Sequence, residues 1–177
     1  MKYILRVINI CLVVLTLVFS SITSAIELPP KDVYAGHTLI DDWDVEAAEQ
    51  FTDSLLKKHP KSGDVYFLKA RVEFLKGHHE LAAKILNQVT GNHSEVREFK
   101  SLVNNTFEET KLFTSSESEH FIYRYKKGPD EILVHYATEV LEKSYKTLGE
   151  IFNYYPKDKV LVEFYPDRES FSRISPL

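Results

Sequence analysis

Hydrophobic residues recur every three or four positions over the segment 29–113, which predicts a series of amphipathic helices. The clearest helix runs from Asp64 to Lys76, and Gly77 ends it. A second helix is expected from His79 to about Val89, and a third from Ser94 to about Leu112. Short helices separated by turns predict antiparallel helical hairpins.

Within this segment, the stretch from Pro29 to about Thr90 repeats itself with a period of 34 residues, which is typical of stacked helical hairpins. Five positions of the first copy align with similar residues of the second: Gly36, Ile40, Glu46, Ala48 and Leu55 with Ala70, Phe74, Glu80, Ala82 and Val89. Repeats of this kind bury their apolar faces only against neighbours. Two copies and one further helix therefore predict that the array packs against whatever follows it.

The second copy resembles the tetratricopeptide repeat in five signature positions: Tyr66, Ala70, Gly77, Ala82 and Val89. The first copy keeps Gly36, Ala48, Leu55 and Pro60 but departs from the pattern at Asp32 and Trp43. The resemblance implies a surface that binds a protein or peptide. An unrelated pair of amphipathic hairpins is the alternative interpretation of these residues.

Beyond residue 113 the pattern changes to short aromatic and β-branched runs. Strands are predicted at Phe121–Tyr125 and Val160–Tyr165, on either side of a long helix from Asp130 to about Tyr154 that Pro156 stops. If the strands are parallel, this crossover is expected to be right-handed. The polar stretch Thr114–Glu119 predicts a linker or loop between two units, and Asp167 is the expected N-cap of a further helix.

These elements together resemble the start of the peptidase-MA-like domain, a metallopeptidase of the gluzincin type. The resemblance rests on three stretches and their order: Ser118–Tyr125, Asn153–Pro156, and Val160–Asp167 followed by Ser170-Phe171. It implies a large exported bacterial protein in which such a domain follows a signal peptide and tetratricopeptide-like repeats. The zinc helix of that family would come later in a longer parent protein.

No catalytic residue of that family is present in these residues. His79-Glu80 begins like the zinc motif H-E-x-x-H, but Ala83 stands where the second histidine belongs. We therefore expect His79 to lie at a solvated helix start, and we assign no catalytic, cofactor or metal residue within 1–177. Zinc is expected only in a longer parent.

Two further groups of residues have a simple structural interpretation. The seven histidines show no recognised ligand spacing, so we interpret them as surface side chains. The aromatic residues of the strands and the helix end could line a carbohydrate or peptide groove, but such residues more often form the core. They are Tyr123, Tyr125, Tyr154, Tyr155, Phe164 and Tyr165.

Residues 1–25 have the organisation of a secretory signal peptide: a basic start, an apolar run too short to span a bilayer, and Thr23-Ser24-Ala25 as a cleavage site. Cys11 could anchor a lipid, but Asn9-Ile10 does not suit lipidation. Removing this segment takes Cys11, Lys2 and Arg6 and no acidic residue, so the net charge changes from −4 to −6. An acidic, thiol-free chain excludes disulfides and disfavours nucleic-acid binding.

The sequence thus predicts an α+β protein with a signal peptide at 1–25, tetratricopeptide-like hairpins and a capping helix at 29–113, and the first β-α-β unit of an incomplete metallopeptidase-like domain at 118–177. We expect it to be exported to the periplasm or the medium, with no membrane span after signal cleavage. In one hypothesis the repeats position a protein substrate for a downstream peptidase. In the other the chain is a non-catalytic interaction module.

Overall fold

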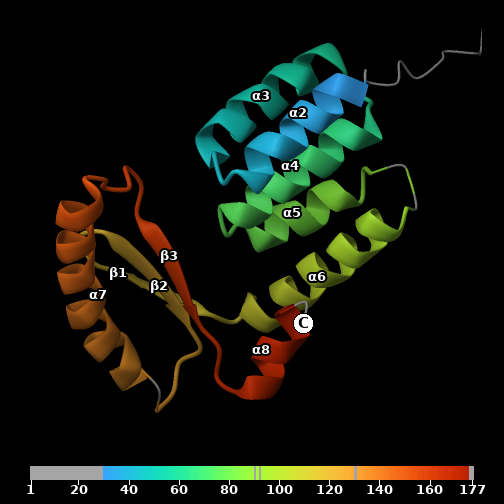
Figure 1. Cartoon of the computed structure of the whole chain (residues 1–177). Helices are drawn as coiled ribbons and strands as arrows, with labels where there is room; N and C mark the ends of the chain where they lie inside the picture. Colours follow the sequence, from blue (N-terminus) through green and yellow to red (C-terminus); the bar gives the residue numbers. More distant parts are fainter. Residues whose placement is uncertain (1–29, 90, 92, 130, 176–177) are drawn as a thin grey trace, which may run out of the picture.

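The computed structural model describes residues 30–175 apart from residues 90, 92 and 130, so the predicted signal peptide lies outside the described residues. Five helices stack side by side and lead into a small sheet covered by one long helix (Figure 1). The predicted α+β class is confirmed. The elements are α2 (Pro30–Asp41), α3 (Val45–Lys58), α4 (Gly63–Leu75), α5 (His79–Leu86), α6 (Ser94–Thr110), β1 (Thr114–Glu117), β2 (Phe121–Tyr125), α7 (Glu131–Phe152), β3 (Val160–Phe164) and α8 (Arg168–Ile174).

The repeat stack has two hydrophobic clusters, one on each side of α4. The first cluster joins α2, α3 and α4 through Ile40, Ala48, Leu55, Val65, Leu68 and Val72. The second joins α4, α5 and α6 through Phe67, Ala70, Ala82, Ile85, Leu86 and Val103. Because α4 is buried on both sides, it is the shared layer of the two hairpins. The alanines of the signature let the helices approach closely, and Ala48, Ala70 and Ala82 are fully buried.

A group of ion pairs also joins α3 to α4. Lys69 of α4 lies 2.9 Å from both Asp53 of α3 and Glu73 of its own helix. Lys76 pairs with Glu49 of α3 at 2.7 Å. Burial opposes the ionisation of Glu73, but hydrogen bonds from His78 and Lys69 hold the pKa of its carboxyl below the usual value. The two hairpins are therefore held together by paired charges as well as by apolar contacts.

The turn between α4 and α5 is a Schellman motif built on Gly77, whose φ is +75°. The Gly77 amide donates to the Phe74 carbonyl, and the His78 amide donates to the Glu73 carbonyl, each at 2.9 Å. A side chain at Gly77 would also collide with the sheet, since a Cβ there would lie 2.1 Å from Leu161 Cδ2. Gly77 is thus one point at which the repeats contact the sheet.

The sheet has three strands in the order β1-β2-β3, with β1 antiparallel and β3 parallel to β2. The two predicted strands are present and pair in parallel, which was the condition for a right-handed crossover. The linker predicted for Thr114–Glu119 was wrong, because Thr114–Glu117 forms β1 and pairs with Ile122–Tyr125. Its TSSE sequence lacks an apolar alternation, because this short edge strand packs little side-chain surface.

The core of this second unit lies between the sheet and α7. Phe121 and Tyr123 of β2 pack with Val134 of α7, and Val162 and Phe164 of β3 join them. The core interpretation is confirmed for Tyr123, which is 1% exposed, but it was wrong for Tyr154 and Tyr155. Those two residues follow the end of α7 and are 68% and 48% exposed.

The ends of the last two helices differ in how well the sequence predicted them. α7 stops at Phe152, before Pro156, because Asn153 adopts a left-handed conformation with φ of 49°. The predicted N-cap of α8 is confirmed, since Asp167 accepts from the Ser170 amide at 2.7 Å. Arg173 of α8 forms an ion pair with Glu109 of α6 at 2.5 Å. This contact places α8 against the last helix of the repeat stack.

We predict that Gly77→Ala destabilises the protein through two separable effects. The left-handed conformation costs about 1–2 kcal/mol for a non-glycine residue, and overpacking against Leu161 adds about 1–3 kcal/mol. Urea unfolding of Gly77→Ala, Leu161→Ala and the double variant measures both. In the Leu161→Ala background, Gly77→Ala should keep only the backbone cost. If Gly77→Ala lowers the free energy of unfolding equally in the two backgrounds, a side chain at position 77 does not clash with Leu161.

Candidate functional site

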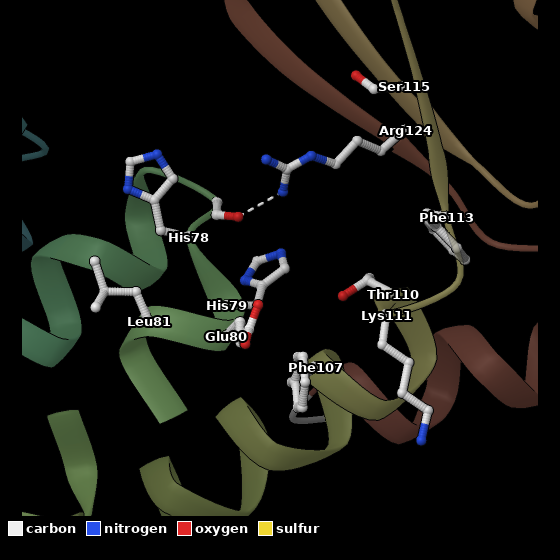
Figure 2. Close-up of a pocket in the computed structure, with 11 residues that line it drawn as sticks. His78, His79, Glu80, Leu81, Phe107, Thr110, Lys111, Phe113, Ser115 and Arg124 are labelled. Atoms are coloured by element: carbon white, nitrogen blue, oxygen red, sulfur yellow. Dashed lines mark hydrogen bonds between the residues drawn. The ribbon is translucent and has the colours of Figure 1, made fainter. Parts of the chain in front are cut away.

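An open cleft of about 550 Å³ lies where the repeat stack meets the sheet (Figure 2). One wall is the α4–α5 turn with the first residues of α5, and the opposite wall is the end of α6 with the start of the sheet. The lining residues are Gly77, His78, His79, Glu80, Leu81, Phe107, Thr110, Lys111, Phe113, Ser115 and Arg124. Residues from both predicted units therefore build one site.

A buried histidine and a carboxylate join the two units behind the cleft. His79 Nε2 lies 2.9 Å from Glu163 Oε1 of β3, and the two side chains are only 9% and 13% exposed. The expectation of a solvated His79 was therefore wrong: the Schellman turn directs α5 into the sheet rather than into water. His79 Nδ1 is buried without a hydrogen-bond partner among the described residues. The tautomer with its proton on Nε2 suits this setting, since that nitrogen then donates to Glu163.

Glu163 is held in its ionised form by its neighbours. Burial opposes ionisation, but hydrogen bonds from His79 Nε2 and from the Tyr165 hydroxyl, together with the nearby Arg124 charge, hold the pKa of the Glu163 carboxyl below its usual value. Burial and the adjacent Glu163 charge raise the pKa of Tyr165 far above its usual value, so this phenol acts as a donor. The carboxylate thus accepts hydrogen bonds from α5 and from the end of β3.

Arg124 connects this buried group to the open part of the cleft. Its Nη1 donates to the Gly77 carbonyl at 2.5 Å and lies 3.5 Å from Glu163 Oε1. In Figure 2 the guanidinium reaches from β2 across the cleft to the α4–α5 turn. Arg124 therefore braces the turn, which keeps the two walls of the cleft at a fixed separation.

The open part of the cleft combines apolar and polar side chains. Leu81, which is 45% exposed, Phe107 and Phe113 supply apolar surface, and Phe113 packs against Tyr165 with ring centroids 5.5 Å apart. Lys111 and Thr110 stand at the end of α6, and Lys111 pairs with Glu108. Such a mixture can bind a ligand with both an apolar side chain and hydrogen-bonding groups.

A second surface of interest lies on α2 and α4, away from the cleft. Arg71 reaches His37, which precedes it by one 34-residue period, with Nη1 and Nδ1 2.5 Å apart, and its Nη2 donates to Asp41 at 2.9 Å. Burial and the Arg71 charge lower the pKa of His37. Nearby Tyr34 is 75% exposed. The Arg71 charge is therefore already paired with Asp41 and in contact with His37.

The five signature residues predicted from the sequence have structural positions, and one of them reaches the cleft. Ala70 and Ala82 are fully buried between helices, Tyr66 donates to the Pro60 carbonyl at 3.0 Å, and Val89 packs on the second cluster. Gly77 alone lines the cleft. Sequence reasoning missed Arg124 and Glu163, because their partners lie 47 and 84 residues away along the chain.

The described residues contain one group that could hold a metal ion, and it lies outside the cleft. Glu119, His120 and Glu142 each offer a ligand atom, and these atoms lie within 4.8 Å of one another. Burial opposes ionisation of Glu142, but hydrogen bonds from the Ser118 hydroxyl and the His120 amide lower the pKa of its carboxyl to about 2. His79 and Glu80 belong to no such group within the described part of the chain. None of the described helices has the length and apolar character needed to cross a bilayer.

We predict that Glu163→Gln destabilises the protein at neutral pH by about 1.5–3 kcal/mol, the usual worth of a hydrogen bond to a charged group. Because the folded-state pKa of Glu163 lies below 4.5, its stabilisation is present above that pH and is lost as the pH falls through the folded value. The difference in the free energy of unfolding between wild type and Glu163→Gln should therefore become smaller in acid. Urea unfolding as a function of pH measures it, with exposed Glu150→Gln as the control. If this difference in unfolding free energy stays constant or grows in acid, the ionised Glu163 carboxylate does not stabilise the fold as described.

Comparison with known proteins supports the repeat interpretation. Residues 6–128, more than half of the chain, match the family model Iml2/Tetratricopeptide repeat protein 39. No curated protein and no solved structure matches the chain. The helical hairpins with a 34-residue period, the buried alanines and the glycine turn agree with this match. The chain belongs to the Iml2/Tetratricopeptide repeat protein 39 family.

Proposed function

We propose that this chain is a protein-interaction module that binds an extended segment of a partner protein in the cleft between the repeats and the sheet. Tetratricopeptide-like repeats generally mediate protein–protein interactions, and the family match supports such a role. The observation that carries the proposal is the cleft itself, which combines apolar side chains with hydrogen-bond donors in a volume of about 550 Å³. Ligand sites of this size commonly combine apolar surface with a few polar groups.

The cleft favours a peptide over a small cofactor for two reasons. It is open to solvent rather than enclosed, so an extended chain can enter and leave without threading through it. Its polar groups are also spread along both walls rather than gathered at one point: Thr110 and Lys111 lie on one wall, and Arg124 reaches from the sheet to the other. A peptide offers carbonyl groups at intervals and an apolar side chain for the surface of Leu81 and Phe107.

The export of the module is a further part of this proposal. It rests on the signal-like organisation of residues 1–25 and places the protein in the periplasm or the medium. The resemblance to a peptidase-MA-like domain adds that the module holds a protein substrate for a metallopeptidase-like unit. A non-catalytic role, in which the module only captures its partner, uses the same cleft.

We predict that a charged side chain placed in the cleft weakens peptide binding. Peptides are first selected from a random displayed library against the full chain, and their affinities are then measured by fluorescence anisotropy. Leu81→Arg places a large charged group on the apolar surface and should weaken binding at least tenfold. Leu112→Arg is the matched control, because Leu112 is 74% exposed but does not line the cleft, and it should bind like wild type.

A different outcome would show that the peptides bind another surface of the protein. If Leu81→Arg and Leu112→Arg bind equally, whereas Tyr34→Ala loses binding, the peptides dock on α2 and α4 and the cleft assignment is wrong. Failure to select any peptide would also count against the proposal.

If the protein is exported, its N-terminus in the cell of origin should differ from that of the full sequence. Signal peptidase acting after Ala25 should leave a mature chain that begins at Ile26 and lacks Cys11. Mass spectrometry of the protein isolated from that cell measures its N-terminus. A product that retains residues 1–25 would contradict export by this route.

A further inference from the structure

A second constellation lies at the far side of the sheet, where the β1–β2 turn meets α7. The turn is Ser118–His120, and three contacts fix it in place. The Ser118 amide donates to the Phe121 carbonyl at 3.0 Å, the Val160 amide donates to the His120 carbonyl at 2.9 Å, and Lys159 Nζ donates to the Ser118 carbonyl at 2.8 Å. The turn is therefore held by β2, β3 and the residue that precedes β3.

Glu142 of α7 orients the His120 ring within this turn. It accepts hydrogen bonds from the Ser118 hydroxyl at 2.5 Å and the His120 amide at 2.9 Å, and its other oxygen lies 2.6 Å from His120 Nδ1. The ring also stacks on Tyr145 with centroids 3.8 Å apart. A carboxylate can only accept, so Nδ1 carries the proton and Nε2 of the neutral ring presents a lone pair.

Glu119 stands opposite that lone pair. Its Oε1 lies 3.8 Å from His120 Nε2, which is too far for a hydrogen bond. Two ligands of one tetrahedral zinc ion, each about 2.0–2.2 Å from the metal, lie about 3.3–3.6 Å apart. The 3.8 Å between these two atoms differs little from that spacing, and a small movement of the exposed Glu119 side chain closes the difference. Glu119 is 83% exposed and His120 is 32% exposed, so water can complete the coordination.

We propose that His120 Nε2 and Glu119 bind a zinc ion at the β1–β2 turn, with Glu142 as the carboxylate that orients the histidine. A hydrogen bond from the second imidazole nitrogen to a carboxylate is the usual support of a zinc-binding histidine. The nitrogen ligand favours zinc over calcium or magnesium, which prefer oxygen ligands only. An open cavity of about 520 Å³ beside the three residues gives the ion access. This site uses none of the residues of an H-E-x-x-H zinc motif.

Titration of the full chain with zinc tests this site. Calorimetry measures the heat of binding, and NMR spectra monitor the imidazole resonances of His120. We expect one equivalent to bind with the His120 signals shifting first. Glu119→Gln removes the charge of an exposed carboxylate and keeps the size of the side chain, and it should weaken zinc binding at least tenfold. His120→Gln should weaken it further. His135→Gln, an exposed histidine on α7, is the matched control and should leave the affinity unchanged.

Several outcomes would overturn the assignment. It fails if zinc does not bind, if Glu119→Gln binds as tightly as wild type, or if the first signals to shift belong to another histidine. A folding defect cannot mask the result, because Glu119→Gln should have the same unfolding transition as wild type in the absence of zinc. A chelator that leaves the melting temperature of the zinc-loaded protein unchanged would also count against the site.

Discussion

The fold depends on one junction, in which the Gly77 turn brings His79 of the repeats to Glu163 of the sheet. Helical repeats bury their apolar faces only against neighbouring layers, so an array of two hairpins and one helix needs support at its end. Here that support is a buried polar contact. A buried carboxylate is costly unless it is paired and hydrogen-bonded, and Glu163 meets this condition only when α5 and β3 adopt their observed positions. The junction therefore favours one arrangement of the two units over others.

The same junction creates the cleft. Because His79 and Arg124 hold the α4–α5 turn against the sheet, the end of α6 is left as the opposite wall, and side chains from both units face a common space. α6 is tied from the other direction as well, through Arg173 of α8 and Glu109. A cleft formed in this way does not exist on either unit alone. The shape of the cleft is thereby coupled to the stability of the junction.

The sequence predicted most of the helices and the strands β2 and β3, because their apolar patterns are strong and local. It also identified Gly77 as a turn residue, since the left-handed end of a helix has a local signature. It did not predict β1, whose polar TSSE sequence pairs through backbone groups rather than packed side chains. Nor did it predict the partners of His79, Arg124 and His120, because these contacts join residues that lie far apart in the sequence and carry no periodic pattern. His79 was interpreted as solvated for the same reason: its helix position is visible in the sequence, but the sheet that covers it is not.

Hydrogen exchange of the full chain and of Glu163→Gln tests most directly whether the junction unites the repeats with the sheet. If it does, the amides of α4 and α5 and those of β2 and β3 should all lose protection in the variant, and by similar factors, because both sides share one stabilising contact. Loss of protection confined to β3, with α4 and α5 exchanging as in wild type, would show that the repeats stand on their own and would contradict the account.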